Sequence, residues 1–407
     1  MAMIEDYISF AFRVFIHRKM RSWLTVIGIL IGIAAVVSLI SIGQGMQDSI
    51  TEQFEMMGID KIMIMPGGEG RIGMLSAFTA AVPLTEDDRK VIEGVSGVEI
   101  AAGMIAKTTS IEFKGDTKYT FVMGLPTDET KKVFEDMEKF RVVEGRNLKE
   151  TDSYSVIIGA DIVDDFFEKD VSIGNRLFIN GDEFKVVGII NKIGNRADDS
   201  QVYIPIEIAK KIFNEPEELM MVYAQVKSGY EPSDVVEKIK EKLRKEKNEK
   251  EGEETFQVST SEQLMDRVST VLGVVQIAVI GIAAISIFVS GVGIMNTMYT
   301  SVLERAREIG IMKAIGARNS DIMLIFLIES GLIGLIGGMI GVGIGISIGK
   351  IVEYLAIEAG MSMLKVSFPI WLIGGALGFS FLAGVLSGVM PAISAARLKP
   401  VEALRYE

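Results

Sequence analysis

Four long stretches of this 407-residue chain are almost free of charge, and they constrain its fold more than any other feature. No Asp, Glu, Lys or Arg occurs in residues 22–47, 268–303 and 366–396, and only Glu329 occurs in residues 322–349. A helix that spans a bilayer needs roughly 20 predominantly apolar residues. Four such stretches in one chain argue against buried helices of a soluble enzyme. We therefore expect four transmembrane helices.

The composition agrees with a chain that separates apolar from charged segments. Its mean hydropathy is +0.34 although 24% of its residues are charged. A cleavable signal peptide is an alternative for the first stretch alone. That stretch begins after residue 21, exceeds the usual length of a signal-peptide core and lacks a small-residue cleavage site, so we interpret it as a retained span.

The distribution of Lys and Arg predicts the orientation of the spans, because these residues collect on the cytoplasmic side. They cluster before the first stretch, between the second and third, and after the fourth: Arg13, Arg18, Lys19, Arg21, Arg305, Arg307, Lys313, Arg318, Arg397, Lys399 and Arg405. Residues 351–367, between the third and fourth stretches, contain a single basic residue, Lys365. This pattern predicts a multi-pass protein of the cell membrane with both termini in the cytoplasm.

These patterns divide the chain into segments. We expect an amphipathic cytoplasmic helix over 1–22, spans over 23–44, 271–297, 322–350 and 368–392, an extracytoplasmic domain over 45–270, a cytoplasmic loop over 298–321, a short external loop over 351–367, and a cytoplasmic tail over 393–407. Residues 44–270 contain 29 Lys and Arg against 44 Asp and Glu, a net charge of −15, whereas the whole chain has −12. The acidic excess therefore belongs to the external domain, where it favours solubility.

Short-range signals in the external domain predict an α+β fold with an inserted β-rich part. Turn residues at Gly115-Asp116 and Asn180-Gly181 lie between alternating apolar and polar residues, as in β-hairpins. The charged segment 233–250 has an apolar stripe at helical spacing. We expect a porter-like α+β module over 46–130 and 216–265, interrupted by a β-rich subdomain over 140–214 that includes a strand over 198–205.

Two of the predicted spans continue beyond the bilayer. Residues 261–268 read as a helix that enters the second span, and the first span continues through residues 45–58, in both cases without proline. Two such extended helices would form a rigid stalk for the external domain, a geometry suited to transmitting motion.

Polar and small residues inside the spans allow two interpretations each. Glycines four residues apart (Gly28 and Gly32; Gly337, Gly341, Gly345 and Gly349; Gly374 and Gly378; Gly384 and Gly388) are typical of helix interfaces in lipid, although glycine is also common in spans. Glu329 is a functional candidate as an intramembrane carboxylate. We favour a structural polar contact, and a proton relay is the alternative.

Several enzyme chemistries lack their residues in this sequence. The chain has no cysteine and one histidine, His17, so thiol nucleophiles, cysteine-ligated metals and histidine-rich metal sites are excluded within one chain. A G-x-S-x-G match at 345–349 lies inside a predicted span, and the glycines before Lys350 do not have Walker A spacing. The methionine clusters, such as Met63 and Met65, favour packing over soft metal binding. We expect a non-catalytic chain without cofactor, metal or nucleic acid.

The cytoplasmic loop at 300–321 is both apolar and charged. Helical spacing aligns Val302, Ala306, Ile309, Met312 and Ile315 on one stripe, surrounded by charged residues. Such an amphipathic helix lies on a membrane surface or docks in a groove of a cytoplasmic protein.

Residues 304–318, ERAREIGIMKAIGAR, resemble the signature loop of the MacB/LolC/FtsX-type ABC transporter permeases. The segments RSWLTVIGILIGIAAVVSL (21–39), GVGIMNTM (291–298) and PAISAARLKPVEALRYE (391–407) are similar to the first span, the end of the second span and the tail of that family. The order of one span, a large external domain and three spans is also the same.

The resemblance implies a permease that works as a homodimer or heterodimer with a separate cytoplasmic ABC ATPase of the MacB/LolD kind, which uses ATP and Mg²⁺. With only 22 residues before the first span, the chain resembles the stand-alone permease subunits of this family. The matching loop positions imply ATPase contacts at Glu304, Arg305, Arg307, Glu308, Gly310 and Lys313.

The implied mechanism is mechanotransmission, with export or extrusion of a peptide, lipoprotein or drug-like substrate. An FtsX-like relay that controls an external enzyme without transport is the alternative. A membrane-anchored receptor or adhesin without an ATPase is a third interpretation.

Overall fold

The computed structural model describes residues 21–58, 60–67, 82–361 and 364–400. The expected N-terminal helix over 1–22, with His17, therefore lies almost wholly outside the described residues. The chain divides into two compact units. We call the first the helical unit (Met1–Met46, Thr270–Leu355 and Lys365–Glu407) and the second the sheet unit (Gln47–Ser269 and Ala356–Leu364).

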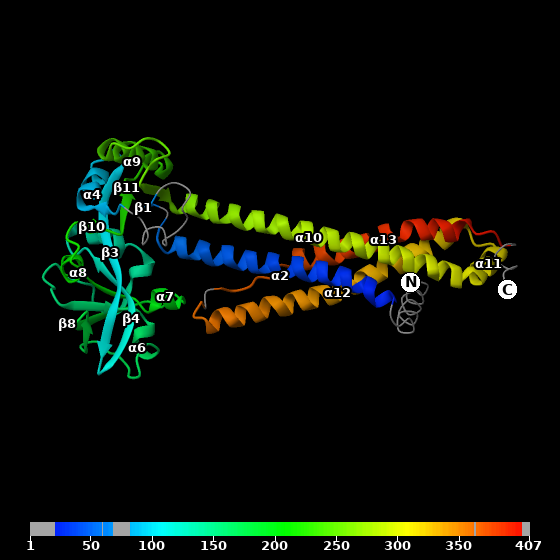
Figure 1. The fold of residues 1–407 in the computed structure, drawn as a ribbon, viewed down its shortest axis with the longest axis horizontal. Coiled ribbons are helices and arrows are strands. Elements are labelled where there is room, and N and C mark those ends of the chain that lie inside the picture. The colour runs from blue at the N-terminus through cyan, green and yellow to red at the C-terminus, as the bar shows by residue number, and fades with distance from the viewer. Residues whose placement is uncertain (1–20, 59, 68–81, 362–363, 401–407) are drawn as a thin grey trace. The chain divides into compact units, whose positions relative to one another are not determined.

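The sheet unit is built on one ten-stranded sheet. Figure 1 labels several of its strands, among them the long strand β3. Its strands run in the order β12-β1-β11-β3-β4-β9-β6-β8-β5, and β7 pairs with β3 and β8. Their bounds are β1 Lys61–Pro66, β3 Val98–Phe113, β4 Asp116–Leu125, β5 Val142–Gly145, β6 Ser155–Ile158, β7 Arg176–Ile179, β8 Asp182–Ile190, β9 Val202–Pro205, β11 Met221–Val226 and β12 Phe256–Thr260. A two-stranded sheet pairs β2 (Leu84–Thr85) with β10 (Glu218–Leu219).

The two parts of the expected α+β domain share this sheet. The 16-residue strand β3 pairs with β11 along its first part and with β4 along its second. Strand β9 from the inserted segment then pairs in parallel with β4, at Val122–Leu125 and Val202–Pro205. The insert therefore extends the sheet of the flanking segments.

Both faces of the sheet bury apolar side chains. Ile62 and Ile64 belong to one buried cluster and Met63 and Met65 to another, because successive residues of a strand point to opposite faces. The first cluster includes residues of α4 (Glu86–Glu93), α8 (Ile206–Phe213) and α9 (Pro232–Lys247), and the second includes residues of α5 (Lys132–Glu135) and η2 (Glu138–Phe140). The packing role predicted for Met63 and Met65 is confirmed.

Local sequence signals place the hairpins and α9 correctly, with one shift. The Asn180-Gly181 turn joins β7 to β8, and both residues have positive φ. The other turn falls on Lys114-Gly115 and not on Gly115-Asp116. Lysine rarely adopts positive φ, so the sequence does not indicate this position.

The expected strand over 198–205 is wrong in its first half. Residues Arg196–Asp199 form the short helix α7, and only Val202–Pro205 form a strand. The Asn195 side chain accepts a hydrogen bond from the Ala197 amide and caps this helix.

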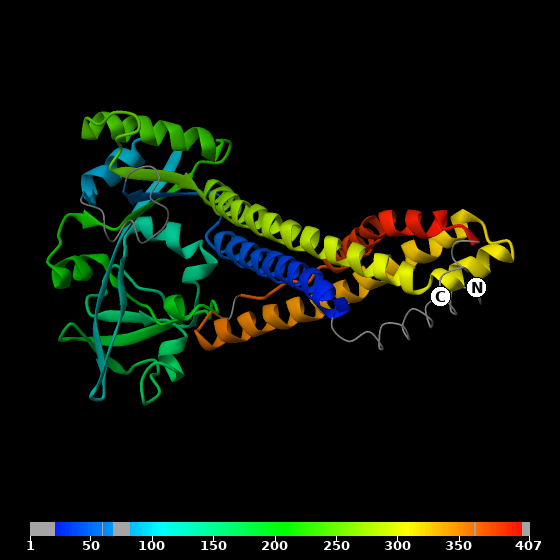
Figure 2. The same cartoon turned by 45° about the vertical axis from the view of Figure 1, so that its right-hand side comes forward.

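The helical unit contains the membrane-spanning candidates. Four helices of the described chain are long and apolar enough to cross a membrane. They are α2 (Arg21–Glu55), α10 (Ser261–Glu304), α12 (Asn319–Glu358) and α13 (Ile370–Arg397), shown from two directions in Figures 1 and 2. Helix α11 (Ala306–Ala314) lies between α10 and α12 in the sequence.

Helices α2 and α10 are continuous through the points where the chain passes from one unit to the other. Helix α2 extends to Glu55 and α10 begins at Ser261, as expected for stalk helices. The start of α10 is capped reciprocally: the Thr260 hydroxyl accepts from the Gln263 amide, and the Gln263 side chain accepts from the Thr260 amide. At 44 residues, α10 is about 66 Å long, more than twice the thickness of a hydrocarbon core.

Most of the spaced glycines lie at helix contacts. A Cβ placed on Gly341 of α12 would lie 2.9 Å from the Leu30 carbonyl oxygen of α2, and one on Gly345 would lie 3.0 Å from that of Ala34. On α13, a Cβ on Gly384 would collide with the carbonyl oxygen of Ser330 in α12. Gly374 and Gly378 differ, since no described heavy atom lies within 4 Å of a Cβ placed there. The interface interpretation therefore holds for α2, for α12 and for the second of the two glycine pairs of α13.

Candidate functional site

The loop between α10 and α12 forms the short helix α11, which begins after Arg305 and ends before Ile315. Its buried side is narrow: Ile309 is fully buried, and Gly310 is buried beside it. Val302 is also buried, as the apolar stripe predicts. Ile315 departs from the stripe and is 82% exposed, because the helix ends one residue before it.

The six residues expected to contact an ATPase fall into two groups. Glu304, Arg307 and Glu308 are exposed. Arg305 and Lys313 are half-buried and bind other parts of the helical unit, and Gly310 is buried. The exposed group can meet a partner directly, whereas Arg305 and Lys313 hold the loop in place.

Arg305 binds the carboxylate inside the third span. Its Nη1 donates to Glu329 Oε2 at 3.0 Å, its Nε donates to Glu308 Oε2 at 3.0 Å, and its guanidinium lies over the Phe326 ring. The side chains of Arg305 and Glu329 are only 13% and 15% exposed. A charge-assisted bond in such a place is strong, because water competes little for either partner. The structural contact predicted for Glu329 is confirmed.

Lys313 fixes the other end of α11. Its Nζ donates to the carbonyl oxygens of Ala396 at 2.5 Å and Leu398 at 2.8 Å. The last carbonyls of a helix lack partners within that helix, and a cation there also interacts favourably with the helix dipole. Lys313 thereby ties the loop to the end of α13, which lies more than 80 residues further along the chain.

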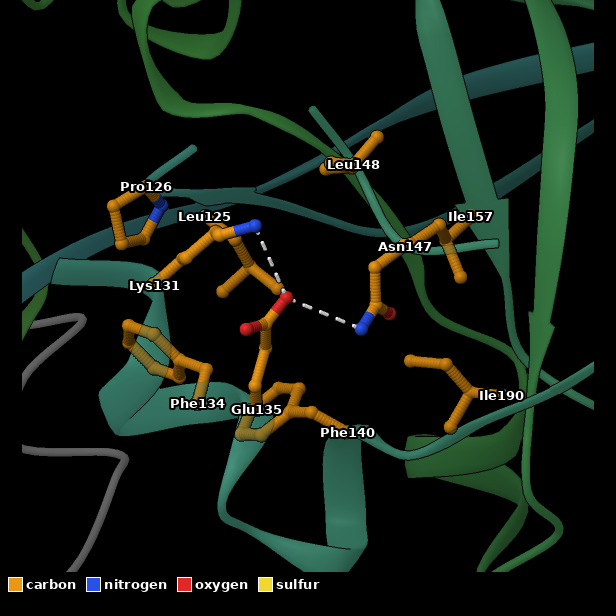
Figure 3. A pocket seen from close by; sticks show the side chains of 10 residues that line it. All are labelled: Leu125, Pro126, Lys131, Phe134, Glu135, Phe140, Asn147, Leu148, Ile157 and Ile190. Carbon is orange, nitrogen blue, oxygen red and sulfur yellow. Dashed lines mark hydrogen bonds and ion pairs between the residues drawn. The ribbon is translucent and has the colours of Figure 1, made fainter. Parts of the chain in front are cut away.

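The sheet unit contains a small apolar pocket, shown in Figure 3. Its volume is about 30 Å³, and its lining comes from β4, α5, η2, β6 and the end of β8. Lys131 and Asn147 both contact Glu135 at its mouth, at 3.3 Å each. Pockets for drug-sized ligands measure roughly 300–1,000 Å³. This pocket is therefore too small for such a ligand.

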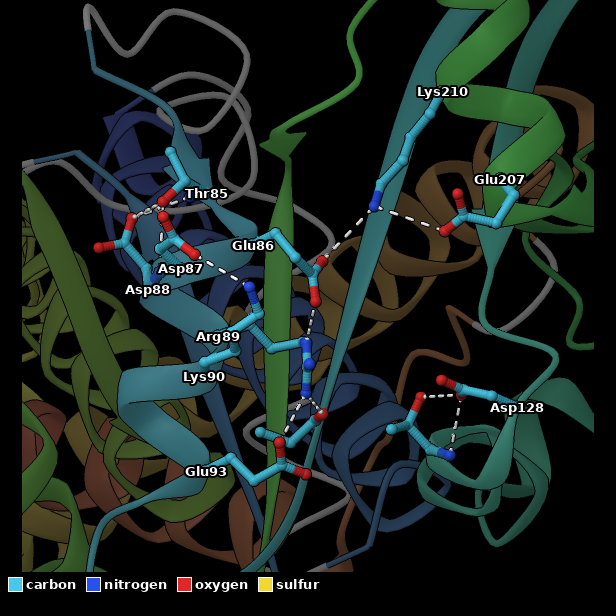
Figure 4. Close-up of polar contacts among 12 residues, drawn as sticks. Thr85, Glu86, Asp87, Asp88, Arg89, Lys90, Glu93, Asp128, Glu207 and Lys210 are labelled. Atoms are coloured by element: carbon cyan, nitrogen blue, oxygen red, sulfur yellow. Dashed lines mark hydrogen bonds and ion pairs between the residues drawn. The ribbon is translucent and has the colours of Figure 1, made fainter.

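A polar cluster at the start of α4 has a structural role (Figure 4). The Thr85 hydroxyl accepts from the Asp88 amide at 3.2 Å, and Asp88 Oδ2 accepts from the Thr85 amide at 2.8 Å, so these two residues form a complete capping box. Glu86 binds Arg89 of the same helix and Lys210 of α8. These side chains bind one another and hold α4 against α8.

Acidic residues elsewhere in the described ranges do not gather into a metal site, since no group of three or more His, Cys, Asp or Glu side chains there could hold a metal ion. Burial raises the pKa of the Asp199 carboxyl above its ordinary value, although the Ile193 and Gly194 amides donate to it. Asp199 therefore serves to shape the turn that precedes α7.

The described chain combines four helices that are long and apolar enough to cross a membrane with a large α+β unit and one anchored loop helix. Residues 22–242 match the family described as the MacB-like periplasmic core domain, and residues 280–400 match the FtsX-like permease C-terminal family. The chain belongs to the MacB/FtsX family of ABC transporter permeases.

Relatives that match almost the whole of this chain agree with this assignment. The chain is 38% identical over 405 residues to an uncharacterized ABC transporter permease of Methanocaldococcus jannaschii, covering 99% of this chain and 98% of the relative. It is 30% identical to the macrolide export ATP-binding/permease protein MacB 2 of Aeromonas hydrophila, covering 98% of this chain but only 60% of that protein. Membership implies an ABC ATPase as partner and a membrane subunit of a kind that is generally non-catalytic.

The periplasmic region of MacB from Actinobacillus actinomycetemcomitans superposes with a TM-score of 0.44 at 14% identity, covering 54% of this chain and 97% of that one.

Proposed function

We propose that this chain couples ATP hydrolysis on a separate cytoplasmic ABC ATPase to movement of the sheet unit by mechanotransmission, for export or extrusion of a peptide, lipoprotein or drug-like substrate. The observation that carries the proposal is the double anchoring of α11. Arg305 and Lys313 tie this helix to α12 and α13, while Glu304, Arg307 and Glu308 stay exposed. A partner that displaces the exposed side therefore displaces two spans with it.

The proposal includes an orientation and an assembly. The loop around α11 and both termini face the cytoplasm, where ATP and Mg²⁺ are used by the partner, and residues 45–270 lie outside. The permease acts as a homodimer or heterodimer. In support, only 6% of the most apolar stretch of α10 is buried against other described residues, compared with 50% for α2. This leaves apolar side chains such as Ile277 and Phe288 for lipid or for a second permease subunit.

The sharpest test reverses one exposed charge on α11. Arg307→Glu should reduce the ATPase stimulation by the full-length permease in membrane vesicles about tenfold or more, which corresponds to roughly 1.4 kcal/mol of lost interaction. The measurement is ATP hydrolysis by the ABC ATPase that co-purifies with the wild-type chain, with and without the permease.

Lys365→Glu is the matched control. Lys365 is also exposed but lies in the loop between α12 and α13, which the proposal places outside the cell. The control should stimulate like the wild type. Full stimulation by Arg307→Glu, or an equal loss in both variants, would show that α11 is not the contact or that the orientation is wrong.

A further inference from the structure

The segment that follows α12 belongs to the sheet unit and ends the helix in a defined way. Gly360 donates its amide to the Ile357 carbonyl at 2.9 Å, and Met361 donates to the Ala356 carbonyl at 2.8 Å. These two bonds, with Gly360 at a φ of +86°, form a Schellman cap. The end of α12 is therefore fixed by its own backbone.

This cap is docked on α7. The Arg196 amide donates to the Gly360 carbonyl at 2.6 Å, and Asn195 and Met361 form an antiparallel β-bridge. A Cβ on Gly360 would collide with the Arg196 side chain, so the contact requires glycine on the cap side. Backbone contacts of this kind set both distance and direction.

The docking surface is itself held firmly within the sheet unit. Asp199 accepts hydrogen bonds from the amides of Ile193 and Gly194, both at 2.7 Å, and so braces the turn before α7. The Thr120 hydroxyl of β4 donates to the Ser200 carbonyl at 2.7 Å. Lys139 pairs with Asp198 at 2.8 Å. A force on α7 is therefore passed to the sheet and does not dissipate in a loose loop.

The first part of α12 is held by the loop that contains α11. Glu329 of α12 accepts the bond from Arg305. Between Glu329 and Ile357 the helix is uninterrupted, which corresponds to about 42 Å at 1.5 Å per residue. An unbroken helix fixed at two points transmits displacement along its axis.

We propose that the contact of Gly360 and Met361 with Asn195 and Arg196 is a second transmission point, through which α12 delivers movement to the sheet unit. This inference rests on the proposed function and adds a route to the one through α2 and α10. The Arg196 amide and Gly360 are then positioning residues for coupling, with no role in binding substrate.

A proline at position 196 removes the contact with little harm to α7. Arg196 is the first residue of α7, a position where proline is favoured. Asn195 before it has an extended backbone, with φ −123° and ψ 113°, and an extended conformation is what a residue preceding proline adopts. Arg196→Pro deletes the amide donor to Gly360. Arg196→Ala keeps the amide and truncates only an exposed side chain, so it is the matched control.

The absence of cysteine in the chain permits a covalent version of the contact. Residues paired in an antiparallel bridge have Cα atoms about 4.5–5.5 Å apart, within the range of a disulfide. Asn195→Cys with Met361→Cys should therefore cross-link in full-length protein under mild oxidation. Adding Arg196→Pro should slow this cross-linking at least several-fold, and adding Arg196→Ala should not.

The functional measurement follows the sheet unit during ATP hydrolysis. Nitroxide labels at Tyr119→Cys and Ile370→Cys, both strongly exposed, report an ATP-dependent distance change in the permease reconstituted with its ATPase. Wild type and Arg196→Ala should show the full change. Arg196→Pro should reduce it at least about threefold while ATP hydrolysis stays stimulated, a combination that simple unfolding would not give.

The outcomes separate this inference from the function beneath it. A full distance change in Arg196→Pro overturns the second transmission point alone. A wild-type complex with neither stimulation nor distance change overturns the proposed function as well. The oxidised double-cysteine variant should keep coupled, stimulated hydrolysis. If oxidation abolishes coupling, the contact has to open during the cycle and does not transmit movement as proposed.

Discussion

The sheet unit and the helical unit place large and small residues differently. In the sheet unit, large side chains such as Phe184, Tyr203 and Phe256 are buried completely. In the helical unit, neighbouring helices come close at glycines, as where Gly341 of α12 meets α2 and Gly384 of α13 meets α12. Large side chains therefore fill the interior of the sheet unit, and small residues let the helices of the helical unit come close together.

The solvents of the two units explain the difference. In water, burial of apolar area provides about 25 cal/mol per Å², so large buried side chains stabilise the sheet unit. Lipid tails are as apolar as the side chains, and helices in a bilayer gain mainly from close van der Waals contact. Small residues permit that contact. The comparison predicts that loss of volume is costly in the sheet unit and that gain of volume is costly in the helical unit.

The largest expected effect is on the sheet side. Phe184→Ala should destabilise the sheet unit by about 3–5 kcal/mol, because it opens a cavity at a fully buried site of β8. Hydrogen exchange of the β6 and β8 amides in the full-length chain measures this loss. Phe178→Ala is the control on the neighbouring strand β7, where the residue is 40% exposed, and it should cost far less. Equal losses in both variants would contradict a core specified by bulk.

The next effect is of the opposite kind. Gly384→Ala adds one methyl group to α13 where the Ser330 carbonyl of α12 leaves no room, and should destabilise the helical unit by about 1–3 kcal/mol. Gly378→Ala adds the same group to the same helix at an open position and should be neutral or slightly stabilising. Thermal unfolding in lipid nanodiscs compares the two. A harmless Gly384→Ala would remove the basis of the comparison.

The sequence predicted those features of both units that depend on neighbouring residues. Four apolar stretches predict the spans, and the Asn180-Gly181 turn predicts one hairpin. The apolar stripe of Val236, Ile239 and Leu243 predicts the buried side of α9. Each of these signals is complete within a few helical turns or one hairpin. No distant partner is needed to read it.

Features that depend on distant partners could not be predicted in this way. The parallel pairing of β4 with β9 joins segments 80 residues apart, and periodicity contains no information about it. In the candidate site, contacts with distant residues could not be predicted either. The resemblance selected the loop and its six residues, but it could not separate exposed Arg307 from Lys313, whose partners are carbonyl groups at the end of α13.

The smallest expected effect concerns the charge pair of Arg146 and Asp152 in the sheet unit. We compare it with the more buried pair of Arg305 and Glu329 in the helical unit. Arg146 donates to both carboxylate oxygens of Asp152, at 2.6 and 3.0 Å, but its side chain is 40% exposed. This bond lowers the pKa of Asp152 below its ordinary value. A depressed carboxyl pKa stabilises the fold above the unfolded-state pKa of about 3.9, and the contribution is lost as pH falls through the folded pKa.

Asp152→Asn should therefore cost less than about 1 kcal/mol at pH 7, as is usual for a partly exposed pair, and the cost should shrink below about pH 4. Hydrogen exchange around β6 at several pH values measures it, with exposed Asp170→Asn as the control. A cost of several kcal/mol would mean that water screens this pair as little as it screens Arg305 and Glu329. Charge pairs would then not distinguish the two regions, and the contrast between them would rest on apolar packing alone.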